Sequence, residues 1–124
     1  MNTAQRTILV VDDDPDISMM LKMMLEFKGY LVKTADRQEK IYEVLGNNHI
    51  DLIIMDMLLS GVNGTDICTE LKENNLINHI PIMMISAHPN AKEICEQAGA
   101  NDFISKPFDM QDILSKIALH TAKN

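Results

Sequence analysis

The sequence is poor in aromatic residues, cysteine and positive charge, and the shortages of cysteine and positive charge each argue against a class of protein. It has no tryptophan, and its two cysteines, Cys68 and Cys95, lack the spacing of a zinc site or a disulfide framework, so free thiols are expected. A formal net charge of −7 argues against a surface that binds nucleic acid or anionic lipid. No apolar run reaches the roughly 18 residues that span a bilayer, and the polar first residues do not form a signal peptide. We therefore expect a cytoplasmic protein without a membrane segment or direct nucleic-acid contacts.

The apolar residues that are present are mostly aliphatic side chains and methionine. They make up 46% of the 124 residues, which is enough for one hydrophobic core. The length leaves no room for a second folded unit. We expect a single domain over residues 1–124, with a folded core from about residue 6 to about residue 120.

Short apolar runs alternate with segments of helical periodicity along the whole chain. The runs predict strands at 7–11, 30–35, 52–56, 80–85 and 102–105. Helices are predicted at 15–28, 37–45, 65–72, 92–98 and 110–120. Gly46 is expected to end the second helix, and the pair Asn63-Gly64 to form a turn before the third. This alternation is typical of a doubly wound α/β fold, with a five-stranded parallel sheet and five helices covering both of its faces.

Polar side chains stand where four of the predicted strands end. Asp12 and Asp13 follow the first strand, Asp56 ends the third, Ser86 follows the fourth and Lys106 follows the fifth. Parallel strands open their carboxyl ends on one edge of the sheet, where α/β proteins bind their ligands. These groups are therefore expected to meet at one site.

Clustered carboxylates repel one another, so the predicted site should attract a cation. Oxygen ligands favour Mg²⁺, and the absence of Cys and His at these strand ends argues against zinc. A metal ion, a lysine and a hydroxyl around one carboxylate suit phosphoryl transfer, which depends on positioning and charge neutralisation. Asp56 would be the nucleophile, while Lys106 and Ser86 would each contact a phosphoryl oxygen.

Four motifs in this order resemble the receiver domain of bacterial response regulators: VVDDD, IIMDMLLSGVNG, MMISA and GANDFISKPF. The similarity covers nearly the whole chain. It implies a flavodoxin-like sheet with the strand order 2-1-3-4-5, in which the first and third strands are neighbours. It also implies a phosphorylation switch, which assists its own phosphorylation and dephosphorylation, rather than an enzyme with turnover.

The resemblance assigns a role to each residue at the predicted metal site. Asp56 matches the phosphoacceptor of the family. Asp13 matches the direct Mg²⁺ ligand and Asp12 an assisting residue that acts through water, while the backbone carbonyl of Leu58 would be a further ligand.

The resemblance also assigns the residues that would transmit the signal. Ser86 matches the hydroxyl residue that moves toward the phosphoryl group, and Lys106, followed by Pro107, matches the family lysine. Phe103 stands at the aromatic position whose rotation reports phosphorylation. The implied phosphodonor is a sensor histidine kinase or a histidine phosphotransfer protein, whereas the downstream partner or effector domain is not specified.

The sequence departs from the family pattern near the proposed phosphoacceptor. Ser60 stands where the family usually has proline, and the segment between Ser86 and Gly99 is short and has few charges. Leu58 and His88 each lie two residues beyond a site residue, at positions that in the family tune the attack of water on the phosphate.

Several alternatives use the same residues differently. Asp12 and Asp14 form the Asp-x-Asp of a haloacid dehalogenase-type phosphohydrolase, although Pro15 and the lack of a cap insertion oppose that reading. A pseudo-receiver scaffold that is never phosphorylated is a second alternative, and a flavodoxin-like nucleotide binder, disfavoured by its acidic first loop, is a third.

Other polar residues are expected to have structural rather than functional roles: Asp14 and Asp16 as helix-terminal charges, and His49, His79 and His120 as surface residues. The methionines at 19, 20, 23 and 24 are expected to pack in the core.

Overall fold

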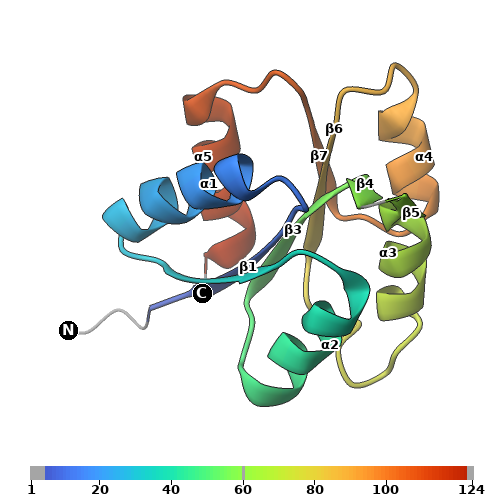
Figure 1. Cartoon of the computed structure of the whole chain (residues 1–124), viewed down its shortest axis with the longest axis horizontal. Helices are drawn as coiled ribbons and strands as arrows, with labels where there is room; N and C mark the ends of the chain where they lie inside the picture. Colours follow the sequence, from blue (N-terminus) through green and yellow to red (C-terminus); the bar gives the residue numbers. More distant parts are fainter. Residues whose placement is uncertain (1–4, 60, 123–124) are drawn as a thin grey trace.

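The structure is a computed structural model that describes residues 5–59 and 61–122. Its centre is a parallel sheet in the order β2-β1-β3-β6-β7 (Figure 1). The strands are β1 (Thr7–Val11), β2 (Leu31–Ala35), β3 (Leu52–Asp56), β6 (Ile82–Ser86) and β7 (Asp102–Ser105). The predicted α/β class, the five parallel strands and the flavodoxin-like order are confirmed.

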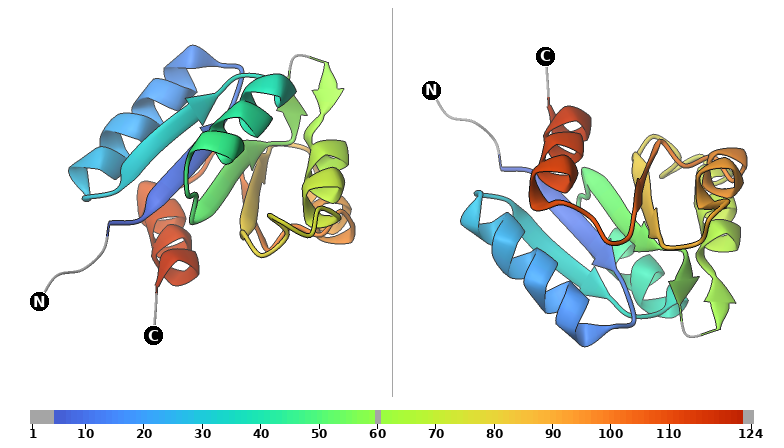
Figure 2. Two further views of the ribbon diagram at one scale, coloured as in Figure 1. Left: turned by 90° about the horizontal axis from the view of Figure 1, so that it is seen from below. Right: turned by 90° about the horizontal axis from the view of Figure 1, so that it is seen from above.

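Helices cover both faces of this sheet (Figures 1 and 2). They are α1 (Pro15–Phe27), α2 (Gln38–Asn47), α3 (Gly64–Lys72), α4 (Ala91–Gln97) and α5 (Met110–Thr121). One apolar cluster joins the sheet to α1 and α5, and a second joins its other face to α2, α3 and α4. In β1, Ile8 and Val10 belong to the first cluster, whereas Leu9 and Val11 belong to the second. A strand buried on both faces needs a continuous apolar run, which is why the central strands β1, β3 and β6 could be found in the sequence.

A small hairpin follows β3 and was not predicted. It consists of β4 (Leu58–Leu59) and β5 (Val62–Asn63), which pair antiparallel, and Gly61 lies in its turn with a φ of +82°. Such a backbone conformation favours glycine. The expected turn at Asn63-Gly64 is wrong, because Asn63 caps α3 by accepting a hydrogen bond from the Thr65 backbone N–H at 3.1 Å. Ser60 lies outside the described residues.

Several predicted boundaries differ from the structure by one or two residues, and two of these differences have a clear physical reason. Helix α2 does not end at Gly46 but continues to Asn47. The side chains of Asn47 and Asn48 donate hydrogen bonds to the carbonyls of Glu43 and Val44, each at 2.9 Å, so the last turn does not need a glycine cap. Strand β6 begins at Ile82, because Pro81 has no backbone N–H to contribute to the sheet.

The methionines of α1 lie mostly on its outer face, so the expectation that they pack in the core is wrong for three of them. Met19 and Met23 are 58% and 63% exposed, and Met20 is also exposed. Leu21 and Leu25 carry the buried face of this helix. None of the helices within the described ranges combines the length and the apolar character required to cross a membrane.

Candidate functional site

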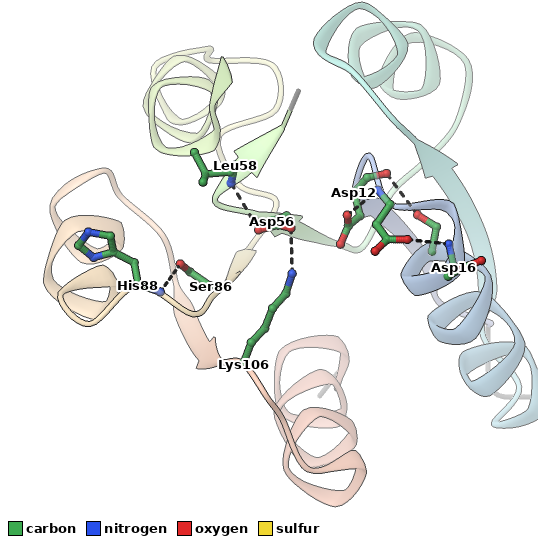
Figure 3. A network of polar contacts seen from close by, with 9 residues as sticks. Asp12, Asp16, Asp56, Leu58, Ser86, His88 and Lys106 are labelled. Carbon is green, nitrogen blue, oxygen red and sulfur yellow. Dashed lines mark hydrogen bonds and ion pairs between the residues drawn. The ribbon is translucent and has the colours of Figure 1, made fainter. Parts of the chain in front are cut away.

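The predicted site residues meet at the carboxyl edge of the sheet (Figure 3). Val11 pairs with Met55, so Asp12 and Asp56 leave adjacent strands at the same level. Asp56 pairs in turn with Ile85, which places Ser86 one residue further along β6. Lys106 follows β7, and its backbone N–H donates a hydrogen bond to the Ser86 carbonyl at 2.9 Å. The parallel topology therefore brings together four groups that are far apart in the sequence.

Three of these side chains form an acidic cluster. Ligand atoms of Asp12, Asp13 and Asp56 all lie within 4.8 Å of one another. Asp12 is only 4% exposed, and its Oδ1 accepts a hydrogen bond from the Asp14 backbone N–H at 2.9 Å. Grouped oxygen ligands from two adjacent strand ends fit a hard divalent cation such as Mg²⁺.

Burial and a neighbouring carboxylate both disfavour the charged form of Asp12. Burial raises the pKa of Asp12 from 3.8 to about 6, against the opposing effect of the Asp14 N–H hydrogen bond. The neighbouring Asp56 carboxylate raises this pKa further, whereas Lys106 lowers it. A bound cation would remove this penalty, so the residues present fit a metal site.

Asp12→Asn is expected to stabilise the metal-free protein at neutral pH. The folded protein holds a proton on Asp12 up to about pH 6, whereas the unfolded chain releases it near pH 3.8. Between these values the folded state binds more protons, so this group lowers the free energy of unfolding as the pH rises. The variant should be more stable by about 1–3 kcal/mol near neutral pH, with no difference below about pH 4. Denaturant unfolding in EDTA across this pH range measures the effect.

Asp36→Asn is the matched control, since Asp36 lies on the surface, where its carboxylate pairs with Arg37 at 2.8 Å. This change should alter the free energy of unfolding by less than about 1 kcal/mol. An Asp12→Asn variant that is less stable than the native protein in EDTA at neutral pH would contradict the electrostatic account.

The Asp56 carboxylate is held at both oxygens. Lys106 Nζ donates a hydrogen bond to its Oδ2 at 3.0 Å, and the Leu58 backbone N–H donates to its Oδ1 at 3.4 Å. Both charged side chains are partly buried, at 26% exposure for Lys106 and 14% for Asp56. Asp56 therefore remains accessible from solvent while a fixed ammonium group lies beside it. The Leu58 carbonyl stays a predicted metal ligand.

Ser86 and His88 lie on the side of Asp56 opposite Asp12 (Figure 3). Ser86 is 7% exposed, and its Oγ accepts a hydrogen bond from the His88 backbone N–H at 3.0 Å. This contact leaves the hydroxyl proton of Ser86 as a donor. The His88 ring is directed away from Asp56 in Figure 3, and its Nδ1 accepts a hydrogen bond from the Asn90 backbone N–H at 3.1 Å. The structure thus brings the backbone of His88 to the site but not its imidazole.

The last predicted site residue lies on β7, and the two acidic residues that were predicted to be helix-terminal charges lie at the start of α1. Phe103 is half-buried in β7 and packs against the apolar cluster beneath α2, α3 and α4. Asp14 is the N-cap of α1, where its Oδ1 accepts a hydrogen bond from the Asp16 backbone N–H at 2.9 Å. Both acidic residues are therefore helix-terminal charges, as expected from the sequence.

Gly64 is a site residue that the sequence did not reveal. A Cβ atom at this position would clash with the backbone carbonyl oxygen of Asp56 and would lie 2.9 Å from that of Met57. The start of α3 is thus packed directly against the chain that carries the central carboxylate. The Asn63-Gly64 pair was the available signal, but it predicted a turn rather than a close backbone approach.

Comparison with known proteins identifies a matching family model, "Response regulator receiver domain", over residues 8–118. The phosphate regulon transcriptional regulatory protein PhoB of Pseudomonas aeruginosa is 32% identical over 114 residues, which are 90% of this chain and 50% of that protein. The DNA-binding response regulator MtrA of Mycolicibacterium smegmatis is 28% identical, over 100% of this chain and 54% of that protein. The chain therefore spans about half the length of these curated relatives.

Solved structures show the same similarity. A response regulator described as putative, from Chloroflexus aurantiacus, superimposes with a TM-score of 0.90 at 32% identity, covering 97% of this chain and 100% of that one. The response regulator TrrA from Thermotoga maritima, solved in complex with Mg²⁺-BeF, gives a TM-score of 0.82 at 26% identity, covering 94% and 99%.

Proposed function

Since this chain belongs to the response regulator receiver domain family, we propose that its phosphorylation switch operates by transfer of a phosphoryl group to Asp56. The observation that carries the proposal is the geometry of this carboxylate. It ends the central strand β3, lies within 4.8 Å of the Asp12 and Asp13 ligand atoms, and accepts a hydrogen bond from Lys106 Nζ at 3.0 Å. A carboxylate oxygen, an acidic cluster and an ammonium group thus lie together, as the proposed transfer requires.

The proposed transfer proceeds from a phosphohistidine donor. An Asp56 carboxylate oxygen attacks the phosphorus atom, a P–O bond forms and the P–N bond to the donor imidazole breaks. The electron pair of the broken bond stays on the imidazole nitrogen. Lys106 lies where it can pair with a phosphoryl oxygen, and the Ser86 hydroxyl can donate a hydrogen bond to another.

A magnesium ion would be held by Asp13, Asp56 and the Leu58 carbonyl, with Asp12 assisting through water. When bound, it would neutralise negative charge on the phosphoryl oxygens. The acidic cluster supports this assignment, as does the pKa of Asp12, which burial and, to a smaller extent, the Asp56 carboxylate raise and which a bound cation would lower.

Lys106→Met tests the role of the ammonium group. The substitution keeps most of the unbranched side chain but removes the charge that lies 3.0 Å from Asp56. Phosphorylation by acetyl phosphate is expected to slow by roughly 10- to 100-fold, because one fixed positive group at the transferring phosphate is lost. The rate is measured as adduct formation with time by intact mass.

Lys22→Met is the matched control for this variant. Lys22 lies on α1 and pairs with Glu26 on the surface, so its loss should leave the rate within about twofold. Equal slowing in both variants would mean that Lys106 acts only through the overall charge of the protein.

The phosphodonor is proposed to dock beside Lys106, on the α1 side of the site. An apolar cavity of about 460 Å³ lies there, lined by Ile17, Met20, Ala87, Pro107, Phe108 and Met110 in addition to Lys106. Apolar side chains next to a polar reaction site can provide contact area for a protein donor. We propose a sensor histidine kinase or a histidine phosphotransfer protein as that donor.

Phosphorylation is proposed to act by population shift. Ser86 would move toward the phosphoryl group, and Phe103, half-buried on the neighbouring strand β7, would follow. Hydrolysis would return the switch to its resting state, with water reaching Asp56 past Leu58 and His88. The residues that would assist the phosphorylation of Asp56 would also assist this hydrolysis.

The family match over residues 8–118 and the greater length of the relatives support the proposed boundaries and output. We propose that residues 1–124 form one cytoplasmic receiver domain, with a core of about 6–120, whose output is a change in binding to a protein partner or effector domain. The curated relatives are named as transcriptional or DNA-binding regulators and are about twice as long. With a net charge of −7, this domain itself is not expected to contact nucleic acid.

The alternatives receive less support. The second aspartate of a dehalogenase motif would be Asp14, whose carboxylate instead caps α1. An unphosphorylated scaffold has no need of a lysine held 3.0 Å from a clustered carboxylate.

Intact mass after incubation with acetyl phosphate tests the proposal. A single phosphoryl adduct is expected in Mg²⁺ and none in EDTA. If no adduct forms with acetyl phosphate or with a phosphohistidine donor, and beryllofluoride does not bind in Mg²⁺, the chain is a scaffold with the receiver fold.

A further inference from the structure

Three histidines gather at the edge of the sheet opposite Asp56. His49 lies just before β3, His79 precedes β6, and His120 is in the last turn of α5. They line one cavity of about 190 Å³, together with Asp51 and Thr121. The chain has four histidines, and these three come from segments widely separated in the sequence. The fold thus brings three imidazole rings to the lining of one cavity.

Two of these rings are held by carboxylates. His49 Nε2 lies 2.9 Å from Asp51 Oδ1, and His120 Nε2 lies 2.9 Å from Asp102 Oδ2. A neutral ring that bonds to a carboxylate must carry its proton on that nitrogen, so Nδ1 keeps a lone pair. Metal-binding histidines commonly have such a carboxylate behind the ring, where it orients the imidazole and increases its basicity.

The two carboxylates are themselves fixed. Asp51 Oδ2 accepts a hydrogen bond from the Thr7 backbone N–H at 2.8 Å. Asp102 Oδ1 accepts from Lys116 Nζ at 2.9 Å and from the Phe103 backbone N–H at 2.7 Å. The hydrogen bonds from His120 and Lys116 lower the pKa of Asp102, although burial acts in the opposite direction. Asp102 therefore stays ionised at neutral pH behind the His120 ring.

His120 is not a surface residue, contrary to the expectation from the sequence. Its side chain is 19% exposed, whereas His49 and His79 are exposed. Within residues 5–59 and 61–122, His79 has no hydrogen-bond or ion-pair partner. This ring is therefore available to a ligand without breaking a contact of the fold.

We propose that His49, His79 and His120 bind one borderline-soft divalent cation, represented by Zn²⁺. Three imidazoles with a fourth position open to water are a known coordination set for this ion. In the structure the three rings do not bring their ligand atoms together, since among the described residues only Asp12, Asp13 and Asp56 form a group of three whose ligand atoms lie within 4.8 Å of one another. Binding therefore requires the exposed His49 and His79 to turn toward the more buried His120, and His49 gives up its contact with Asp51 in doing so. The proposal is independent of phosphorylation at Asp56.

Zinc titration of the whole chain tests this site, by calorimetry and by competition with a chromogenic chelator. Excess Mg²⁺ is present throughout, so that the acidic cluster does not capture the added Zn²⁺. One ion per chain is expected to bind. His79→Gln and His120→Gln should each weaken binding by at least about tenfold, because each removes one of three ligands.

His88→Gln is the matched control, because His88 is the histidine that does not line this cavity. This variant should bind Zn²⁺ within about twofold of the native affinity, while Asp13→Asn tests for displacement to the acidic cluster. The proposal is overturned if Zn²⁺ does not bind at millimolar concentration, if His79→Gln binds like the native protein, or if Asp13→Asn weakens binding as much as His79→Gln.

X-ray absorption of the zinc-loaded native protein gives a reading that does not depend on the folding of any variant. Scattering from imidazole rings around the ion is expected. A shell of oxygen ligands alone would overturn the proposal.

Discussion

Asp56→Asn is expected to abolish the phosphoryl adduct formed with acetyl phosphate and Mg²⁺. The amide nitrogen and oxygen of asparagine lack the negative charge of the attacking carboxylate, and the pairing with Lys106 Nζ at 3.0 Å loses its ionic character. The side chain keeps its size, so the strand end and the Leu58 N–H contact should be preserved. Adduct formation should fall by at least about 100-fold, to the detection limit of intact mass.

Ser86→Ala is the informative control for this loss. The Ser86 hydroxyl is another oxygen nucleophile at the same edge of the sheet, one residue beyond the partner of Asp56. The alanine variant should still form the adduct, more slowly, because it loses a hydrogen-bond donor and not the acceptor atom. If the adduct persists in Asp56→Asn and disappears in Ser86→Ala, the phosphoacceptor has been misassigned.

Gly64→Ala is expected to be the most destabilising of the conservative substitutions near the site. The added methyl group would clash with the Asp56 carbonyl oxygen and lie 2.9 Å from the Met57 carbonyl oxygen. Both are backbone atoms of the segment that leaves the central strand, so they cannot move aside as a flexible side chain could. The cost should be about 1–3 kcal/mol in the free energy of unfolding, measured by urea titration.

Gly46→Ala is the control, and its expected effect on stability has the opposite sign. Gly46 lies within α2, and a Cβ atom there would meet nothing within 4 Å. This variant should be more stable than the native protein by roughly 0.5–1 kcal/mol, because alanine loses less conformational entropy in a helix. Similar destabilisation by both substitutions would show that close packing against β3 is not the cause.

Gly64→Ala should also slow the phosphorylation of the molecules that remain folded. The clash displaces the backbone of Asp56, and small displacements at a reacting group are costly in rate. A variant that is unfolded at room temperature can be examined with Gly46→Ala added, since the two glycines lie on different helices and their effects should add. If folded Gly64→Ala is phosphorylated as fast as the native protein, Gly64 does not help to position Asp56.

Much of the fold could be predicted because the central strands β1, β3 and β6 are buried on both faces. The run Leu52–Asp56 is apolar up to its final carboxylate, and the structure has the same strand bounds. The convergence of Asp12, Asp56 and Lys106 then follows from topology alone, because all parallel strands end at the same edge. Roles such as phosphoacceptor or metal ligand stay predictions, since they depend on chemistry that a fold does not determine.

The missed features depend on contacts between segments rather than on local pattern. The β4–β5 hairpin has strands of two residues each, which is too short for any periodicity to appear. The helix period placed Met20 near the buried stripe of α1, but the exact rotation of the helix left it exposed. His120 is partly buried where Asp102, from another element, accepts its hydrogen bond at 2.9 Å. No single segment of the sequence contains this information.

The exposed methionines of α1 have a consequence for how the protein responds to oxidants. Methionine thioethers on the surface are readily oxidised to sulfoxides, whereas those of Met55, Met83 and Met84 are fully buried in the sheet. Peroxide should therefore modify Met19, Met23 and others on the surface first, and leave the core thioethers intact. Conversion of Met20 and Met110 would make the surface next to Lys106 polar without unfolding the domain. An aged or oxidised sample could then retain its full helical content while a protein phosphodonor no longer recognised it.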